Sequence, residues 1–570
     1  MIGTDASSQL VLNTEGTVYD IKSLIGAPVS QATKETYRFP LKTASIDGQS
    51  VYTGVEFNND VYLAGKDDLQ FSQLLASILR QLSTYAESDL LYWQFRQKII
   101  EQRIPKGIPF EKVEPAGKPV KKCVIAVPAS FSACQRAAIL DAGAIAGLDV
   151  IGLIDEGVAS ALTYTDSRRF DLQKGEKNVS ETLLIADLGQ QYFHVAVATV
   201  SYQSVTVLSS ISEPLGTSVL RKQYLNKIES QIREKYKVSS KLSNKTLAKL
   251  DRATEKAIKV LSTSPQTVIE IDNFIPDTDI SLTVTRSDFE ATCDETISNI
   301  KSAITKALDL AKIENTDDLK IELIGGGCRI PSVQSKIQQA VKNGQLHFNL
   351  DSNNSVAIGA GIYGSLVKFS GNYDLENEKR FELHQNQAIS DEDIQKYRLP
   401  QSDLDAFVEF ENKLCQIDRE FVLKENLRNS FEQFIYNFND KVFQFKSSIP
   451  SGEYESVSSK LEDEKQFLLF SGESESLSLA ELSARFEGFK KSLDEAGPTL
   501  KQALDKEIED KRKEDEAAAE AAKNRVETVR DKINNPRTPK ERLDAAIKRK
   551  EQGNTFFAFV SFFFCLLLII

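Results

Sequence analysis

The segment at residues 183–197, LLIADLGQQYFHVAV, is the strongest constraint on the fold because it predicts a buried strand, a tight turn and a second strand. Asp187 and Gly189 interrupt the apolar run, and apolar residues alternate again from Phe193 to Val197. A carboxylate in a buried hairpin is costly to desolvate without a partner, and a metal-bound phosphate with its waters would be one. An ordinary Asp-x-Gly turn explains the same residues, so both interpretations stay open.

Strands and helices alternate ahead of this hairpin. Residues 123–128 (CVIAVP) predict a buried strand that ends at a proline, and residues 135–147 predict an alanine-rich helix that ends at a glycine. A second strand is expected at 150–154 and a helix of small residues at 158–164. This order is typical of a sheet flanked by helices.

Several charged and glycine positions have two interpretations each. Lys22 is consistent with a solvated surface lysine, and Glu255 and Lys259, four residues apart, with an exposed ion pair worth about 0.3–0.5 kcal/mol. The three glycines at 325–327 lie between a strand and a helix, which allows either close approach of phosphate or adenosine or tight packing. They match neither a Walker loop nor a GxGxxG fingerprint. A glycine-containing helix at 355–367 indicates close packing against a sheet.

Composition excludes several classes of protein. The net charge of −12 argues against nucleic acid as the main partner, and 41% hydrophobic residues indicate a globular chain with room for several domains. The six cysteines have no CxxC spacing and the three histidines stand far apart, so no zinc site or disulfide framework is implied. Residues 1–9 lack the basic and apolar regions of a secretory signal, so we expect a reducing, cytoplasmic location.

Residues 1–370 resemble the nucleotide-binding domain of the 70-kDa heat-shock chaperone family, with the divergent 110-kDa branch most similar. Four segments carry the resemblance in the family's order, at 126–164, 187–195 (DLGQQYFHV), 253–266 (ATEKAIKVLSTSPQ) and 324–334 (IGGGCRIPSVQ). The resemblance implies an α/β actin-like ATPase fold of two lobes, with ATP or ADP and magnesium in the cleft between them.

The resemblance also implies roles for individual residues. Lys22, Glu156 and Asp187 match catalytic positions; Asp187 and Glu156 would lie near the magnesium, Glu156 through a water. Contacts to the nucleotide are implied at Gly189, Glu255, Lys259, Ser262, Gly325, Gly326, Gly327 and Arg329.

The hairpin departs from the family pattern. The family's DLGGGTFD reads DLGQQYFH at 187–194, so residues 190–192 replace two glycines and a threonine, and His194 replaces an acid near the magnesium. Ile258 stands where the family has a further lysine. Because the hairpin is likewise degenerate in the 110-kDa branch, the resemblance implies ATP binding with weak or absent hydrolysis.

Two parts of the family's architecture are expected to be missing. Residues 3–11 resemble a family segment that normally lies well inside the domain, so we expect the first strands and the first phosphate loop to be absent and the first lobe to be incomplete. A truncated gene model would explain this. The family's β-sandwich is also not expected, because residues 371–400 have the composition of a polar linker.

The remainder of the chain is predicted to be helical. Apolar residues at helical spacing predict a bundle at 401–500 that resembles the family's lid, with an aromatic stripe that is either core or, less favoured, a client-binding surface. A charged helix is expected at 501–535 and a partial tetratricopeptide-like helix at 540–557. The apolar tail at 556–570 is short for a span of about 20 residues, and either a tail anchor or an intron read in frame explains it.

These features predict a chaperone-class protein that binds ATP and assists protein folding. We expect a nucleotide exchange factor or holdase that acts with a 70-kDa heat-shock partner and with unfolded client proteins. An ATP-hydrolysing foldase is the alternative from the enzyme class. A membrane-tethered or nucleotide-free scaffold is a third interpretation.

Overall fold

The computed structural model describes residues 2–28, 37–46, 49–56, 68–101, 121–168, 180–202, 204–275, 278–317, 319–341, 344–366, 382–385, 389–470 and 473–534. Their contacts divide the chain into two compact units, of which the first contains the described residues up to Val408 and the second those from Glu409 onwards. The predicted helix at 540–557 and the apolar tail at 556–570 lie outside the described residues.

A six-stranded sheet forms the centre of the first unit, in the order β12-β11-β6-β7-β8-β13. Strands β6, β11 and β12 run parallel to one another, β7 is antiparallel to β6 and to β8, and β13 runs parallel to β8. The strands are β6 (Glu181–Leu188), β7 (Phe193–Val200), β8 (Ser204–Glu213), β11 (Lys320–Ile324), β12 (Gln345–His347) and β13 (Glu382–His384).

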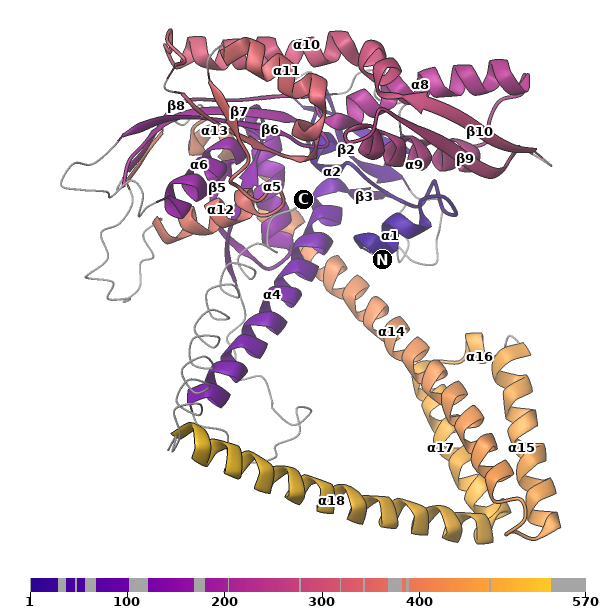
Figure 1. Cartoon of the computed structure of the whole chain (residues 1–570). Coiled ribbons are helices and arrows are strands. Elements are labelled where there is room, and N and C mark those ends of the chain that lie inside the picture. The colour runs from indigo at the N-terminus through magenta and orange to yellow at the C-terminus, as the bar shows by residue number, and fades with distance from the viewer. Residues whose placement is uncertain are drawn as a thin grey trace. The chain divides into compact units, whose positions relative to one another are not determined.

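Helices cover both faces of this sheet, which is why β6 is a continuous apolar run instead of an alternating one. Leu184, Ala186 and Leu188 of β6 face a core that also contains residues of four helices, whereas Leu183 and Ile185 face two others. The four helices are α8 (Thr217–Tyr236), α9 (Asn244–Leu261), α10 (Arg286–Leu310) and α11 (Pro331–Val341), and the two others are α6 (Glu156–Ser167) and α12 (Ser355–Leu366). In Figure 1, α10 and α11 lie above the sheet and α6 and α12 lie below it.

Helix α12 packs mainly against α6. A Cβ atom on Gly359 would lie 1.7 Å from the carbonyl oxygen of Ala159, so no larger residue fits between the two helices. The predicted close packing is therefore present, but its main partner is a helix, with β4 as a second neighbour near Gly364.

The amino-terminal part of the first unit carries smaller sheets. β1 (Leu41–Ile46), β2 (Gln49–Glu56) and β3 (Asp68–Gln70) form an antiparallel sheet beside α4 (Phe71–Glu101). β4 (Lys122–Val127) and β5 (Asp149–Asp155) pair in parallel, and within the described ranges they pair only with each other. α5 (Ala133–Ile145) connects them and begins at a capping box of Ser132 and Gln135.

The remaining elements of the first unit are two short helices and a hairpin. The helices are α1 (Thr4–Gln9) and α2 (Ile21–Leu24), and the hairpin of β9 (Gln266–Ile275) and β10 (Thr278–Thr285) lies beside α9.

The described part of the predicted linker at 371–400 is ordered on the first unit. Besides β13, it contains α13 (Asp391–Gln395), which packs against α5. The buried Asp141 carboxylate of α5 receives the Arg398 guanidinium and, 3.1 Å away, the backbone N–H of Leu399. The polar sequence of residues 371–400 did not reveal this attachment, because the attachment depends on Asp141, a buried acid far away in the chain.

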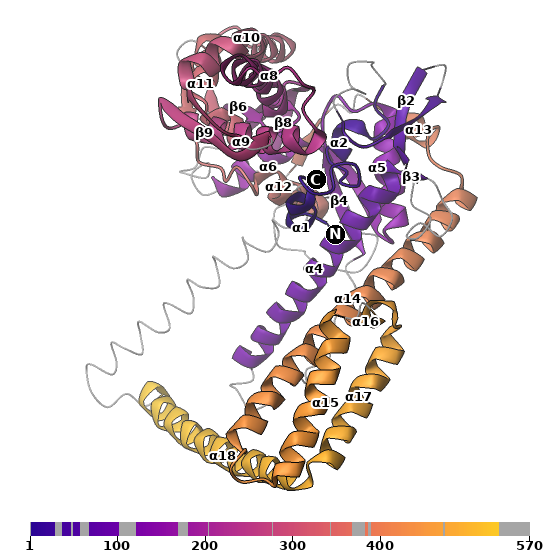
Figure 2. The same ribbon diagram turned by 90° about the vertical axis from the view of Figure 1, so that its right-hand side faces the viewer.

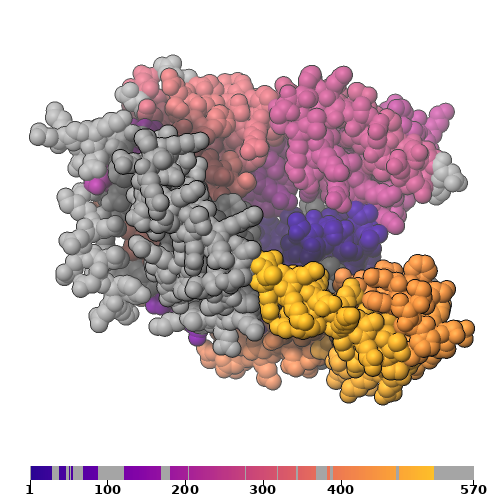
Figure 3. All heavy atoms as spheres, turned by 60° about the horizontal axis from the view of Figure 1, so that its bottom comes forward, coloured from indigo at the N-terminus to yellow at the C-terminus, as the bar shows by residue number. Residues whose placement is uncertain are grey.

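Every regular element in the described residues of the second unit is a helix. Figures 1 and 2 show α14, α15 and α17 side by side, and Figure 3 shows the helices of this unit as closely packed atoms. Phe431 and Phe486 stack with ring centroids 4.3 Å apart, so the interpretation of the aromatic stripe as core is confirmed there. The helices are α14 (Gln401–Gln444, which begins in the first unit), α15 (Ser451–Phe470), α16 (Glu473–Ser476), α17 (Leu479–Ala496) and α18 (Pro498–Asn534).

Among the helices of the described ranges, none is both long and apolar enough to cross a membrane. The six-stranded sheet with helices on both faces confirms the predicted α/β fold, and the helices from α14 onwards confirm the predicted helical region.

Candidate functional site

A cavity of about 600 Å³ lies at the carboxyl ends of the parallel strands β6 and β11. This edge of an α/β sheet is where ligands commonly bind, because the following loops and helix starts converge there. The cavity is lined by Leu188, Gly189, Gln190, Thr217, Ser218, Arg221, Glu255, Ile258, Lys259, Ser262, Gly326, Gly327, Arg329, Ile330 and Asn353.

The cavity gathers seven of the eight residues for which the sequence predicted nucleotide contacts. Gly189 comes from the turn after β6, and Glu255, Lys259 and Ser262 come from the end of α9. Gly326, Gly327 and Arg329 come from the short 3₁₀ turn η2 (Gly326–Arg329), which follows β11. Gly325 is not part of the lining.

The three glycines after β11 have different roles, so both interpretations of this loop apply. Gly325 has a φ of 78°, and a Cβ atom there would lie 2.4 Å from the Leu188 carbonyl oxygen. A Cβ atom on Gly327 would lie 2.4 Å from Leu188 Cγ. These two glycines therefore serve packing. A Cβ atom on Gly326 would have no other atom within 4 Å, so this residue leaves the backbone open to the cavity.

Cationic side chains dominate the cavity. Arg221, Lys259 and Arg329 line it together with a single carboxylate, that of Glu255. Lys259 Nζ lies 2.7 Å from Glu255 Oε1, and Arg221 Nη1 lies 3.4 Å from Glu255 Oε2. Burial pushes the pKa of Glu255 up, but Lys259 and Arg221 outweigh it and hold the pKa below its usual range. The remaining positive charge suits an anionic ligand.

Arg221 is a lining residue that the sequence did not indicate. It lies one turn into α8, and its Nε atom is 3.3 Å from Asp251 Oδ1 of α9. The i, i+4 spacing of Asp251 and Glu255 places both carboxylates on one helical face, where a basic side chain can pair with both. No neighbouring sequence identified Arg221 as that side chain. Gln190, Thr217, Ser218 and Asn353 were missed as well.

The altered hairpin turn closes onto the start of α8. The backbone N–H groups of Gly216, Thr217 and Ser218 donate to the carbonyl oxygens of Gln191, Gly189 and Gln190, at 3.1, 3.0 and 2.8 Å. The first amides of a helix are a common anion site, but here they bond to the turn. An anion in the cavity therefore depends on side-chain cations and on the glycine loop after β11.

The three predicted catalytic residues gather in a separate cluster with His194. Lys22 lies in α2, Glu156 is the first residue of α6, and Asp187 lies in β6 opposite His194 of β7. Asp187 is buried within the strand, and the turn is closed by the Gly189 N–H and the Tyr192 carbonyl, so the explanation of Asp187 as a turn residue is wrong. The explanation of Lys22 as a solvated lysine is also wrong, because its ammonium pairs with Glu156.

Glu156 holds the centre of this cluster. Its Oε1 forms an ion pair with Lys22 Nζ, and its Oε2 lies 3.0 Å from His194 Nε2. Burial pushes the pKa of Glu156 up, but His194 and Lys22 outweigh it and hold the pKa far below its usual range. Burial raises the pKa of Asp187 to about 6, with the charge of Glu156 adding to the rise and His194 and Lys22 opposing it.

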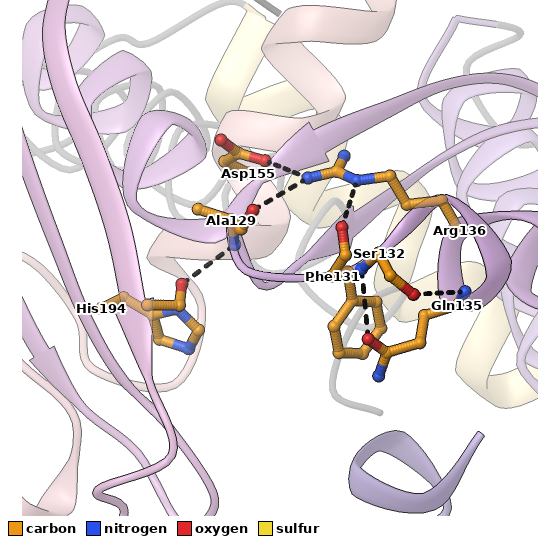
Figure 4. A network of polar contacts seen from close by, with 8 residues as sticks. Ala129, Phe131, Ser132, Gln135, Arg136, Asp155 and His194 are labelled. Carbon is orange, nitrogen blue, oxygen red and sulfur yellow. Dashed lines mark hydrogen bonds and ion pairs between the residues drawn. The ribbon is translucent and has the colours of Figure 1, made fainter. Parts of the chain in front are cut away.

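His194 connects the cluster to the loop after β4. Its Nδ1 lies 2.8 Å from Ser212 Oγ, which accepts the backbone N–H of Ala129 at 2.9 Å. Arg136 holds this loop by donating to the Ala129 carbonyl at 3.4 Å and by pairing with Asp155 at 3.0 Å (Figure 4).

The cluster does not fit a hydrated magnesium ion. Magnesium requires near-octahedral oxygen ligation and keeps several waters. Both oxygens of Glu156 are engaged by nitrogen groups, and an ammonium stands where a cation would approach. Among the described residues, no group of three or more His, Cys, Asp or Glu side chains is arranged to hold a metal ion.

The layered α/β sheet, with helices on both faces and a cavity at the carboxyl ends of β6 and β11, has the architecture of an actin-like α/β domain. The family model described as Hsp70 protein matches residues 1–97 and 111–377, so this chain belongs to the Hsp70 family. The predicted family is thereby confirmed, while its assignment to the 110-kDa branch stays a prediction.

Curated relatives agree with the family. The chain is 28% identical over 370 residues to the heat shock 70 kDa protein of Neurospora crassa, in a match that covers 64% of this chain and 51% of that protein. It is also 28% identical over 370 residues to a ribosome-associated molecular chaperone of Saccharomyces cerevisiae, with 64% and 54% covered. The chain therefore spans about half the length of the curated relatives it matches.

Proposed function

We propose that this protein is a chaperone-class protein that binds an adenine nucleotide, ATP or ADP, in the cavity beside β6 and β11. The observation that carries the proposal is the cavity lining, which joins three cations to an open glycine loop. Arg221, Lys259 and Arg329 would neutralise phosphate charge, and Ile258 and Ile330 would supply apolar walls for the base.

Isothermal calorimetry of the full chain with ATP and with ADP tests this proposal. Gly326→Val places bulk in the cavity at a position where an added Cβ atom meets no other protein atom within 4 Å, so it is expected to weaken binding by at least roughly tenfold, with no loss of fold by circular dichroism. Gly452→Val makes the same change at an exposed site in α15 and is expected to leave binding unchanged. Equal binding by both variants would place the nucleotide elsewhere.

We further propose that the protein acts on a catalytic 70-kDa heat-shock partner as a nucleotide exchange factor, or on unfolded clients as a holdase. Membership of the Hsp70 family supports a chaperone role. The engagement of Lys22 and Glu156 with each other supports a role that does not depend on rapid hydrolysis. Release of fluorescent ADP from a cognate partner is expected to accelerate when this protein is added. No change in that rate, together with no suppression of client aggregation, would remove the proposal.

An ATP-hydrolysing foldase is the second candidate, because Lys22, Glu156 and Asp187 lie together in one cluster. Lys22 would have to leave Glu156 to reach a phosphate. ATP turnover that disappears in Lys22→Ala would establish this candidate, and turnover that is absent or unaffected by the change would remove it.

A further inference from the structure

The Glu156 carboxylate has two nitrogen groups of this chain against it, the Lys22 ammonium as an ion pair and the His194 ring. The side chains of Glu156, His194 and Lys22 are 10%, 4% and 21% exposed, so the group is largely shielded from water. A buried carboxylate is stable only when charge or hydrogen bonds compensate for its lost hydration. Lys22 supplies the charge at one oxygen and His194 supplies the contact at the other.

The contact between His194 and Glu156 requires a proton on one ring nitrogen of His194. Ser212 Oγ accepts the Ala129 N–H and also lies 2.8 Å from His194 Nδ1, which it can serve as donor or acceptor. An ionised carboxylate only accepts hydrogen bonds, so His194 Nε2, 3.0 Å from Glu156 Oε2, carries a proton. A protonated ring nitrogen has no lone pair for a metal. His194 is therefore a donor to Glu156 and not a ligand for a cation.

These contacts join five elements directly. They run from Lys22 in α2 through Glu156 in α6 and His194 in β7 to Ser212 in β8, and end at the backbone of Ala129 in the loop before α5. A bound divalent cation commonly joins such elements by ligation. In this chain ion-pair and hydrogen-bond contacts already do so.

We propose that Lys22 and His194 take the place of a divalent cation at Glu156, so that this site holds no such ion and nucleotide binding requires none. The part of this inference that concerns nucleotide binding rests on the proposed function. The part that concerns the site at Glu156, which holds no divalent cation, is testable without nucleotide.

Nucleotide affinity measured with and without magnesium tests whether nucleotide binding requires a divalent cation. Calorimetry of the full chain with ADP, in excess magnesium and in excess EDTA, is expected to give dissociation constants that agree within roughly twofold. Binding that is present in magnesium and lost in EDTA would overturn the inference and leave the proposed function standing.

Variants of the two donors make the test sharper. His194→Asp replaces the donor with an oxygen ligand, so its ADP affinity is expected to be at least roughly tenfold weaker in EDTA than in magnesium. His194→Gln keeps an N–H donor and is expected to bind equally in both. Should His194→Asp fail to fold by circular dichroism, Lys22→Met, which removes the ammonium, is expected to show the same dependence on magnesium. Cation-independent binding by all folded variants would overturn the roles of Lys22 and His194.

The melting temperature of the nucleotide-free chain separates this inference from the proposed function. Manganese alone is expected to leave the melting temperature of the wild-type chain unchanged and to raise that of His194→Asp. If no nucleotide binds under either condition, the proposed function fails, and an unchanged wild-type melting temperature still supports the cation-free site. A manganese-dependent rise in the wild-type chain would overturn it.

Discussion

His194 Nε2 lies 3.0 Å from Glu156 Oε2, and Lys22 occupies the other oxygen of the same carboxylate. One acid at the start of α6 therefore holds two donors that come from α2 and β7. Because Glu156 is buried, its carboxylate needs both partners to remain charged, and the Lys22 ammonium in turn needs the carboxylate as its counter-charge.

Removing that charge is expected to destabilise the first unit. Glu156→Gln leaves the Lys22 ammonium without its counter-charge in a largely buried place, so we expect a loss of about 3–5 kcal/mol in the free energy of unfolding. Urea denaturation measures this loss. The double variant Lys22→Met, Glu156→Gln removes both charges and is expected to recover part of the stability. Equal stability of Glu156→Gln and the wild-type chain would show that the pair contributes nothing.

The attachment of residues 391–399 to α5 is expected to depend on Arg398. Arg398→Ala leaves the Asp141 carboxylate, whose side chain is 2% exposed, without its counter-charge, and we expect a loss of about 3–5 kcal/mol in the free energy of unfolding.

Lys396→Ala is the matched control for Arg398→Ala. Lys396 pairs with Asp393 at a fully exposed site, so its loss is expected to destabilise the chain far less than the loss of Arg398. Similar losses in the two variants, measured by urea denaturation, would contradict the role assigned to Asp141.

Asp20 is expected to make stability depend on pH. Burial raises its pKa from 3.8 to about 6, although Arg221 and Gln191 oppose the rise. The folded chain therefore binds the Asp20 proton more tightly than the unfolded chain, and this contribution is complete below pH 3.8 and lost as the pH rises through 6.

Asp20→Asn removes this dependence. Asn also tolerates the φ of 60° at this position, so we expect the variant to be about 1–3 kcal/mol more stable than wild type above pH 6 and to lose that advantage in acid. Denaturation curves measured across this pH range test the sign. Parallel stability profiles for the two proteins would show that Asp20 has no shifted pKa.

The second unit is expected to depend on Phe431. Its side chain is fully buried against Phe486 and Phe489, so Phe431→Ala is expected to cost about 3–5 kcal/mol through lost burial and a cavity. Phe443, on the same helix, is 72% exposed, and Phe443→Ala is expected to change stability by less than about 0.5 kcal/mol. Thermal or urea unfolding of both variants measures the difference. A larger effect at Phe443 would mean that it has a binding partner in solution.

Apolar periodicity was sufficient to predict the layered core. The run at 183–186 and the helix of small residues at 158–164 lie in β6 and α6, because strands buried on both faces and closely packed helices leave strong local patterns. Part of the cavity lining was predictable too, because Glu255, Lys259 and Arg329, for which the resemblance implied nucleotide contacts, all line it.

The features of the site that the sequence did not predict depend on contacts between residues far apart in the chain. Arg221 has no local signal of its role, since Asp251 and Glu255 lie on another helix. Gly325 and Gly326 are adjacent glycines that the sequence does not distinguish, yet Gly325 serves packing whereas Gly326 lines the cavity. His194 was noted only as a departure from the family, and its bonds to Glu156 and Ser212 appear only in three dimensions.

Photolabelling of the full chain with 8-azido-ATP, followed by identification of the labelled peptides, tests nucleotide binding in the cavity directly. Labelling is expected within 253–266 or 324–334, with competition by unlabelled ATP and loss of labelling in Gly326→Val. Labelling confined to other peptides, or labelling that ATP does not compete, would contradict nucleotide binding in this cavity.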